Sequence, residues 1–265
     1  MEALLSYGFL QRAFLAGIFI AIACGLLGVF LILRRDAMIG HGLAHVAFAG
    51  IALGLFLNWM PLVVALIIAV VTALIIMKLK EKTGIYGDTA IAIFSSVGFA
   101  LGVLLVSFAH RFNVDLFSYL FGEILAIEVT EVWLSVMLAA VVVVIVILNY
   151  HTFMYMTFDR ESAKASGIKV GRLDILLTVL TAITVVLGMK VAGILLVSAL
   201  LVIPAAAGLQ LASSFKQAIV YSSFVAVFSV VIGLLLSFYF DFPASGTVVL
   251  LSFLLFGLFF IFKKS

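Results

Sequence analysis

Long apolar runs, separated by short polar stretches, fill almost the whole chain. A helix that crosses a bilayer needs about 20 mostly apolar residues, with a range of about 17–25. Runs of that length predict candidate spans at residues 13–33, 39–57, 61–77, 89–108, 132–149, 173–189, 192–210, 217–239 and 245–262. The pattern therefore predicts an all-α polytopic membrane protein with nine spans, or with eight if the first run only dips into the membrane.

Composition supports the same fold class. Of the 265 residues, 66% are hydrophobic and 10% are charged, whereas a soluble domain is about 45–50% apolar and about 25% charged. No charged stretch is long enough for a separate soluble domain, so we expect one transmembrane domain over residues 1–265 in a lipid bilayer. The single cysteine excludes an intrachain disulfide and a cysteine-based metal site within one chain. Pro204 falls within the seventh run, where it is expected to kink or break the helix.

Basic residues predict the orientation. With the N-terminus outside, one side receives twelve of them: Arg34, Arg35, Lys78, Lys80, Lys82, Arg160, Lys164, Lys169, Arg172, Lys216, Lys263 and Lys264. The other side receives three: Arg12, Arg111 and Lys190. Because cytoplasmic loops carry the excess of Lys and Arg, the C-terminus is predicted to be cytoplasmic. The net charge of +3 is too small to suggest a nucleic-acid partner.

Two histidines stand near the start of the second run, within the stretch RRDAMIGHGLAHVAFAGIALG at residues 34–54. His41 and His45 are four residues apart, so on a helix they share one face with Cβ atoms about 6 Å apart. Neutral imidazole binds zinc and similar metals, and ionisable groups inside a membrane are candidates for function. The alternative is that the two rings only form hydrogen bonds between helices.

One irregular stretch lies at residues 114–131 and reads VDLFSYLFGEILAIEVTE. It is apolar but too short and too acidic to span the membrane. It is predicted to be a re-entrant or interfacial helix on the outer side. Its acids are Asp115, Glu123, Glu128 and Glu131. We expect ordinary solvated loop carboxylates here, with attraction of cations at an outer mouth as the alternative.

The longest polar stretch, residues 150–174, contains MTFDRESAKASGIKVGRLD. Asp159 is a good N-cap residue, residues 160–166 fit a short helix, and Gly167 suits its C-terminal end. A short amphipathic helix on the cytoplasmic face can dock on a soluble partner. A simple connecting loop is the alternative from the residues alone.

Several of these stretches together resemble the ABC permease family that imports zinc, manganese or iron. Residues 161–167, ESAKASG, are similar to the family's loop of glutamate, two alanines, three residues and glycine, with Ser162 in place of the first alanine. The other matching stretches are RRDAMIGHGLAHVAFAGIALG, VDLFSYLFGEILAI, GILLVSALLVIPAAAG and DFPASGTVVL. The resemblance covers nearly the whole chain and is closest to the zinc branch, where the arginine pair, the sequence YLFG and the proline turn all occur.

This resemblance implies the fold of a type II ABC importer permease, in a multi-pass bacterial-type cell membrane. It implies a homodimer with a metal pathway along its axis, two copies of an ATP-binding subunit and an extracytoplasmic metal-binding protein. The cytoplasmic coupling loop, about 150–172, would press on the ATPase through Asp159, Glu161, Ala163 and Gly167. The chain itself has no GxxxxGK[ST] phosphate loop, so a separate subunit must hydrolyse ATP.

The predicted metal site departs from the family pattern. The family usually has aspartate and, four residues later, histidine, whereas this chain has His41 and His45. Two histidines favour a softer, nitrogen-preferring ion, so zinc leads over manganese and iron. The ion is expected as cargo, with no permanently bound cofactor.

Two other functions stay open from the sequence. A proton-coupled secondary metal transporter would use the same histidines and would need no ATPase. An intramembrane metalloenzyme is disfavoured, because Gly42 replaces the glutamate of the H-E-x-x-H motif and supplies no general base.

Overall fold

The structure, a computed structural model, describes residues 8–83, 87–108, 122 and 127–262. Within these ranges it contains only α-helices: α2 (Gly8–Leu33), α3 (Ile39–Phe56), α4 (Pro61–Thr83), α5 (Gly87–Phe108), α7 (Val129–Leu148), α8 (Tyr150–Phe158), α9 (Arg160–Ala165), α10 (Val170–Ala192), α11 (Ile194–Leu211), α12 (Phe215–Phe240) and α13 (Ala244–Phe262). All of them except α8 and α9 are long and apolar enough to cross a membrane. The predicted all-α polytopic fold is confirmed, and the nine predicted runs coincide with these helices.

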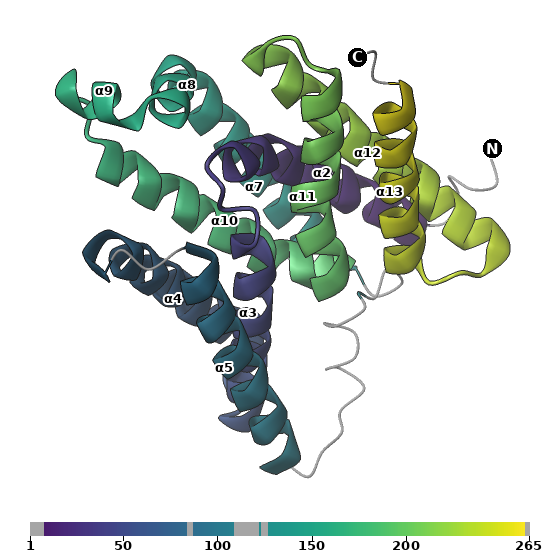
Figure 1. The fold of residues 1–265 in the computed structure, drawn as a ribbon. Coiled ribbons are helices and arrows are strands. Elements are labelled where there is room, and N and C mark those ends of the chain that lie inside the picture. The colour runs from purple at the N-terminus through teal and green to yellow at the C-terminus, as the bar shows by residue number, and fades with distance from the viewer. Residues whose placement is uncertain (1–7, 84–86, 109–121, 123–126, 263–265) are drawn as a thin grey trace.

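The helices form two groups, which Figure 1 shows as an upper bundle and a lower projection. The lower projection, which we call the leg, consists of α3, α4 and α5, with α3 packed against both of the others. The upper bundle, which we call the body, consists of α2, α7, α11, α12 and α13. Within it, α2 is enclosed by α7, α11 and α12. Helix α10 joins the two groups, because it contacts α3 and α4 on one side and α2, α7 and α11 on the other.

Glycines allow the close approach of helices within the leg. A Cβ atom added to Gly50 of α3 would lie 2.5 Å from the Cα of Ala65 in α4. A Cβ atom on Gly98 of α5 would lie 2.9 Å from the Cα of Val46 in α3. Small residues let membrane helices pack at backbone distance. These glycines therefore let α3 pack directly against the backbones of α4 and α5.

Helix α11 continues through Pro204 without interruption, and Pro204 is buried. The hypothesis of a broken helix at this position is therefore wrong, whereas a kink remains a prediction. Neighbouring helices on several sides hold the two halves of α11 together, which is how membrane proteins tolerate a proline inside a span.

The acidic stretch is only partly described, and its last residue corrects a prediction. Asp115, Glu123 and most of the predicted re-entrant helix at residues 114–131 lie outside the described residues. Glu128 is exposed, as expected of a solvated acid, but Glu131 is buried in the first turn of α7. Its carboxylate forms an ion pair with Lys190 at the end of α10 and accepts a hydrogen bond from the Glu128 backbone amide at 3.2 Å. Glu131 therefore links α7 to α10, and the prediction of a solvated loop carboxylate is wrong for it.

Candidate functional site

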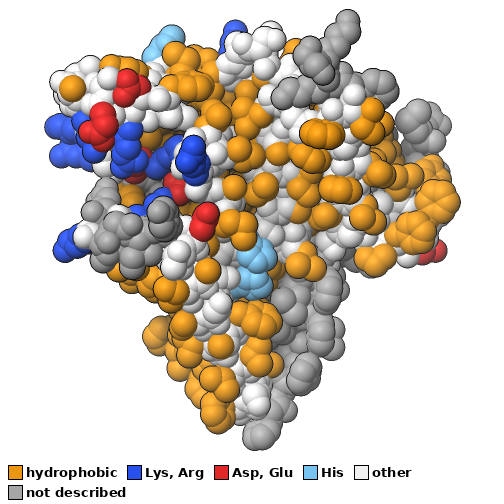
Figure 2. Space-filling view, viewed as in Figure 1, with side chains coloured by type: hydrophobic (Ala, Val, Ile, Leu, Met, Phe, Trp, Pro, Cys, Tyr) orange, Lys and Arg blue, Asp and Glu red, His pale blue; other side chains and the backbone are white. Residues whose placement is uncertain are grey.

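The two histidines of α3 lie side by side and hydrogen-bond to each other. The Nε2 atoms of His41 and His45 are 3.2 Å apart, and the two rings are nearly perpendicular. Both side chains are half-buried. Figure 2 shows histidine side chains at the middle of one face of the molecule, over α3, where the leg meets the body. The spacing prediction of a shared helix face is confirmed.

The leg fixes the orientation of this pair. Gly42, between the two histidines, faces α5 so closely that a Cβ atom on it would lie 2.5 Å from Ile91. This contact places the Gly42 side of α3 against α5. The side of α3 that carries the two histidines stays partly exposed. Phe99 of α5 covers the outer edge of His45, with ring centroids 5.2 Å apart.

The pair has the geometry of a two-nitrogen metal site. A tetrahedral zinc ion with Zn–N bonds of about 2.0–2.1 Å needs two nitrogens about 3.3 Å apart. The observed 3.2 Å between the two Nε2 atoms matches this requirement. Among the described residues there is no group of three or more His, Cys, Asp or Glu side chains that could hold a metal. The described part of one chain therefore brings two imidazole nitrogens together at this position, and a tetrahedral ion held there would need further ligands from elsewhere.

The predicted coupling segment folds as the sequence suggests. Asp159 caps α9 by accepting a hydrogen bond from the Ser162 amide at 2.9 Å. Hydrogen bonds from the side chain and backbone of Ser162 lower the pKa of the Asp159 carboxyl below its ordinary value. Gly167 has φ +82°, the left-handed conformation that ends a helix and favours glycine.

The remaining two residues of that segment divide between core and solvent. Ala163 is completely buried and joins the apolar core. Glu161 points into solvent and pairs with Lys164 at 3.1 Å. Helix α9 is thus anchored by its apolar side and presents a charged side outward, as a docking element requires. Helix α8, directly before it, was not predicted.

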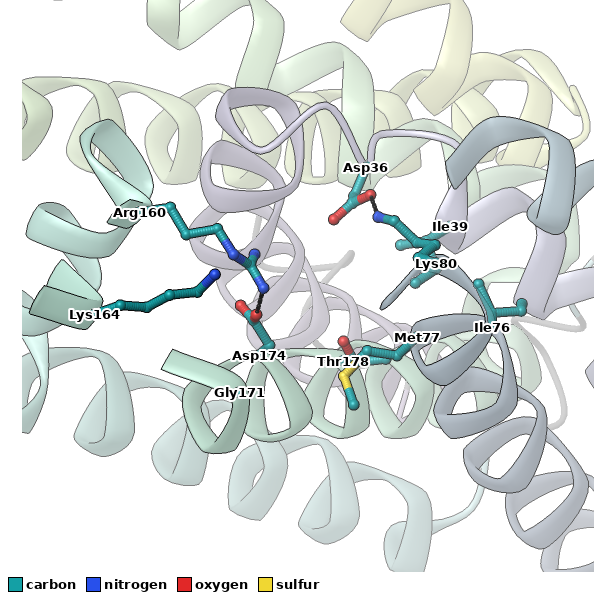
Figure 3. A pocket seen from close by; sticks show the side chains of 10 residues that line it. All are labelled: Asp36, Ile39, Ile76, Met77, Lys80, Arg160, Lys164, Gly171, Asp174 and Thr178. Carbon is teal, nitrogen blue, oxygen red and sulfur yellow. Dashed lines mark hydrogen bonds and ion pairs between the residues drawn. The ribbon is translucent and has the colours of Figure 1, made fainter. Parts of the chain in front are cut away.

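A pocket of about 520 Å³ lies between α9, α10 and α4, and the sequence did not indicate it. Figure 3 shows Arg160 directed at Asp174 on one wall, and Lys80 directed at Asp36 on the opposite wall. Arg34, just before α3, lies 2.6 Å from Asp174 and 3.9 Å from Asp36. The only signal in the sequence was the placement of these charges at the ends of apolar runs.

The comparisons with known proteins identify the family. Residues 6–263 match the family described as "ABC-3: ABC 3 transport family". The chain belongs to the ABC 3 transport family. The predicted family is confirmed, and its members are membrane-spanning permease subunits.

Two curated relatives cover almost the whole chain. The manganese transport system membrane protein MntC of Listeria monocytogenes is 33% identical over 262 residues, which cover 99% of this chain and 93% of the relative. The high-affinity zinc uptake system membrane protein ZnuB of Haemophilus influenzae is 32% identical over 246 residues, which cover 93% and 94%. These names include both manganese and zinc, so the assignment to the zinc branch remains a prediction.

A solved structure shows the same fold. The structure described as "PsaBC from Streptococcus pneumoniae in complex with Fab" has a TM-score of 0.89 and 31% sequence identity, and the match covers 99% of this chain and 95% of that one. The arrangement of leg, α10 and body is therefore shared over nearly the full length of both chains.

Proposed function

We propose that this chain is the membrane-spanning subunit of an ATP-driven importer of divalent metal ions, and that its ion is zinc. Family membership and the names of the relatives support a metal permease. The observation that carries the proposal is the pair of imidazole nitrogens 3.2 Å apart on the exposed side of α3. That distance suits two of the four ligands of a tetrahedral zinc ion.

A second copy of the chain completes the site. A two-fold axis beside the histidine face brings four imidazoles together, and four nitrogens satisfy zinc without a carboxylate. Helix α5, next to the pair, exposes a large apolar face that includes Val97, Leu101 and Leu104. This face suits burial against the second copy or lipid. The ion then moves along the axis of the homodimer.

Ion selectivity follows from the residue at position 41. Hard ions such as manganese prefer carboxylate and carbonyl oxygens, whereas imidazole nitrogen suits zinc. His41 and His45 provide only nitrogen and carry no negative charge when neutral. The chain therefore favours zinc, holds it without a carboxylate, and releases it more easily than an acidic site would.

The α9 end of the molecule faces the cytoplasm in this proposal. Figure 2 shows the Lys and Arg side chains gathered near that end, as expected of the cytoplasmic side. Two ATP-hydrolysing subunits contact the coupling segment around α9, and an extracytoplasmic metal-binding protein delivers zinc to the opposite side. The C-terminus is then cytoplasmic.

The test is zinc uptake into vesicles that contain the chain together with its ATP-hydrolysing subunit. ATP is enclosed in the vesicles, and the metal-loaded binding protein is added outside. We expect ATP-dependent uptake of zinc in excess of manganese. His41→Ala combined with His45→Ala should lower uptake at least about tenfold, because a loss of 1.4 kcal/mol in binding is already a factor of ten.

A second variant tests the choice of ion. His41→Asp restores the usual family pair and should move the ratio of zinc to manganese uptake toward manganese. Unchanged zinc uptake in the double alanine variant would show that the histidine pair is not the metal site. If zinc uptake is the same with and without ATP, the result favours the proton-coupled transporter instead.

A further inference from the structure

Five charged side chains alternate in sign at the pocket of Figure 3: four of them line the pocket, and Arg34 lies beside them. They form the order Arg160, Asp174, Arg34, Asp36 and Lys80, which we call the charge chain. Arg160 and Asp174 approach from the α9 and α10 wall, and Lys80 and Asp36 stand on the opposite wall. Arg34 contacts both carboxylates, so it connects the two walls.

Asp174 has the least exposed side chain of the five residues in the charge chain. Its side chain is 2% exposed, and both of its carboxylate oxygens are used. Oδ2 accepts from Arg160, while Oδ1 has an ion pair with Arg34 and no aligned hydrogen bond within the described residues. A buried carboxylate that loses one cationic partner is strongly destabilised. Asp174 therefore holds Arg160 and Arg34 in fixed positions relative to each other.

The two arginines belong to elements with different roles in the proposed importer. Arg160 is the first residue of α9, the predicted coupling helix. Arg34 lies in the tight turn between α2 and α3, which is closed by a hydrogen bond from the Asp36 amide to the Leu31 carbonyl at 2.8 Å. Helix α3 begins three residues after Asp36 and carries His41 in its first turn. Asp174 thus stands between the coupling helix and the helix of the histidine pair.

We propose that Asp174 and Arg34 are positioning residues that pass the displacement of α9 to α3 during transport. The proposal rests on the function proposed above. When the ATPase moves α9, Arg160 moves with it, and Asp174 transmits this movement to Arg34 and the start of α3. The histidine pair then reorients with its helix. Lys80, through Asp36, carries the same displacement to α4 of the leg.

A purely structural role predicts a different outcome. If the charge chain only holds the fold together, loss of Asp174 lowers stability and reduces ATP hydrolysis and transport in proportion. If it transmits movement, the variant still hydrolyses ATP but moves less zinc for each ATP. Coupling between two sites is typically a factor of about 5–150, so the expected change is measurable.

The experiment uses the complete complex in vesicles and measures zinc imported and ATP hydrolysed in the same sample. Asp174→Asn should retain at least about half of the hydrolysis and lower the zinc-to-ATP ratio about tenfold, within the typical range of such couplings. Asp174→Glu keeps the charge and should restore most of the ratio. If Asp174→Asn fails to fold, Arg160→Gln tests the same link, because the Arg160 side chain is 44% exposed.

The matched control is Glu131→Gln, which removes a buried ion pair at the opposite end of α10. It should lower thermal stability and leave the zinc-to-ATP ratio unchanged. The inference is overturned if Asp174→Asn keeps the wild-type ratio, or if Glu131→Gln lowers the ratio equally.

A readout without metal separates this inference from the proposed function. Spin labels on Ala165→Cys in α9 and Leu57→Cys at the far end of α3 report the distance between the two elements, and the native Cys24 is buried. Trapping the complex with nucleotide should change this distance in the wild type and not in Asp174→Asn. An equal change in both proteins, or none in the wild type, contradicts the inference. If wild-type vesicles import no metal while this distance still responds through Asp174, the proposed function fails and the link stands.

Discussion

The leg and the body are built from similar apolar helices, and each region encloses one helix and leaves another mostly exposed. In the body, 72% of the most apolar window of α2 and 17% of that of α13 are buried, and in the leg the corresponding shares are 72% for α3 and 17% for α5. The histidine pair lies on the leg, at the surface where leg and body meet. The two regions therefore share one pattern of packing, and the half-buried histidine pair is what sets the leg apart.

The two regions also use polar groups differently. In the body, Ser222 is completely buried and donates a hydrogen bond to the Gly25 carbonyl of α2 at 2.7 Å. In the leg, His41 and His45 hydrogen-bond to each other along one face of α3, and both side chains are half-buried. A polar group that ties two helices stabilises the fold, whereas a half-buried pair on one helix can exchange its mutual hydrogen bond for bonds to a ligand.

The largest effect is expected from a substitution that disrupts the packing of the body. Gly28 of α2 faces α11 so closely that an added Cβ atom would lie 2.0 Å from the Leu201 carbonyl oxygen. Gly28→Ala must push two backbones apart, and we expect a loss of about 3 kcal/mol, the upper end for overpacking. Thermal unfolding in detergent measures it. Gly257→Ala is the control, since nothing lies within 4 Å of its added Cβ, and equal melting of the two variants would contradict the tight core.

A smaller effect is expected from the hydroxyl that ties α12 to α2. Ser222→Ala removes the bond to Gly25 and should cost about 0.6–1.7 kcal/mol, the measured range for such bonds in membranes. The neighbouring Ser223 donates within its own helix, to Ile219 at 2.9 Å. Ser223→Ala is therefore the matched control and should change the unfolding free energy very little. A larger loss in the Ser223 variant would reverse the assignment.

A third substitution concerns the leg's site, and it also removes a stacking contact between Phe99 and Phe48 of α3. Phe99 packs against the edge of His45 and is 45% exposed. Aromatic contacts of this kind contribute about 0.5–1.5 kcal/mol, so Phe99→Leu should weaken zinc binding about two- to tenfold. Competition with a chromophoric chelator measures the affinity. Phe253→Leu, on the exposed side of α13, is the control; if both variants bind zinc alike, Phe99 does not orient the ring.

The smallest expected effect concerns α9, which belongs to neither region. Asp159→Ala removes the cap and should increase hydrogen exchange in α9 while leaving global unfolding unchanged, whereas Asp159→Asn keeps a good cap. Because the folded state lowers the pKa of Asp159, its contribution is present at neutral pH. It is lost as the pH falls through that lowered value. Unaltered exchange in the alanine variant would show that Asp159 does not hold α9.

Much of the fold was predictable because the bilayer fixes the length and composition of each span. The predicted runs coincide with the observed helices, although α2 begins at Gly8 rather than residue 13. Helix α8 was missed, because Tyr150–Phe158 has too few apolar residues to resemble a span. Its Phe153 and Met156 are buried, so tertiary packing stabilises it.

The candidate site was predictable only where it is local in sequence. Helical spacing predicts that His41 and His45 share a face, and cap rules predict the ends of α9. The link between Arg34 and Asp174 joins residues 140 positions apart. Nothing in the local pattern of either residue indicates its partner. Glu131 was misjudged for the same reason, since its partner Lys190 comes from another helix.

Helix α10 has an ion-paired residue near each end, and the two residues pair with different neighbours. Asp174 and Lys190 are about 24 Å apart along the axis at 1.5 Å per residue, and their partners come from the α2–α3 turn, α9 and α7. Sliding or rolling of α10 would pull a buried charge from its counter-ion. We therefore expect α10 to shift as a rigid unit between a few discrete positions rather than continuously, so the protein would have a small number of well-defined conformations.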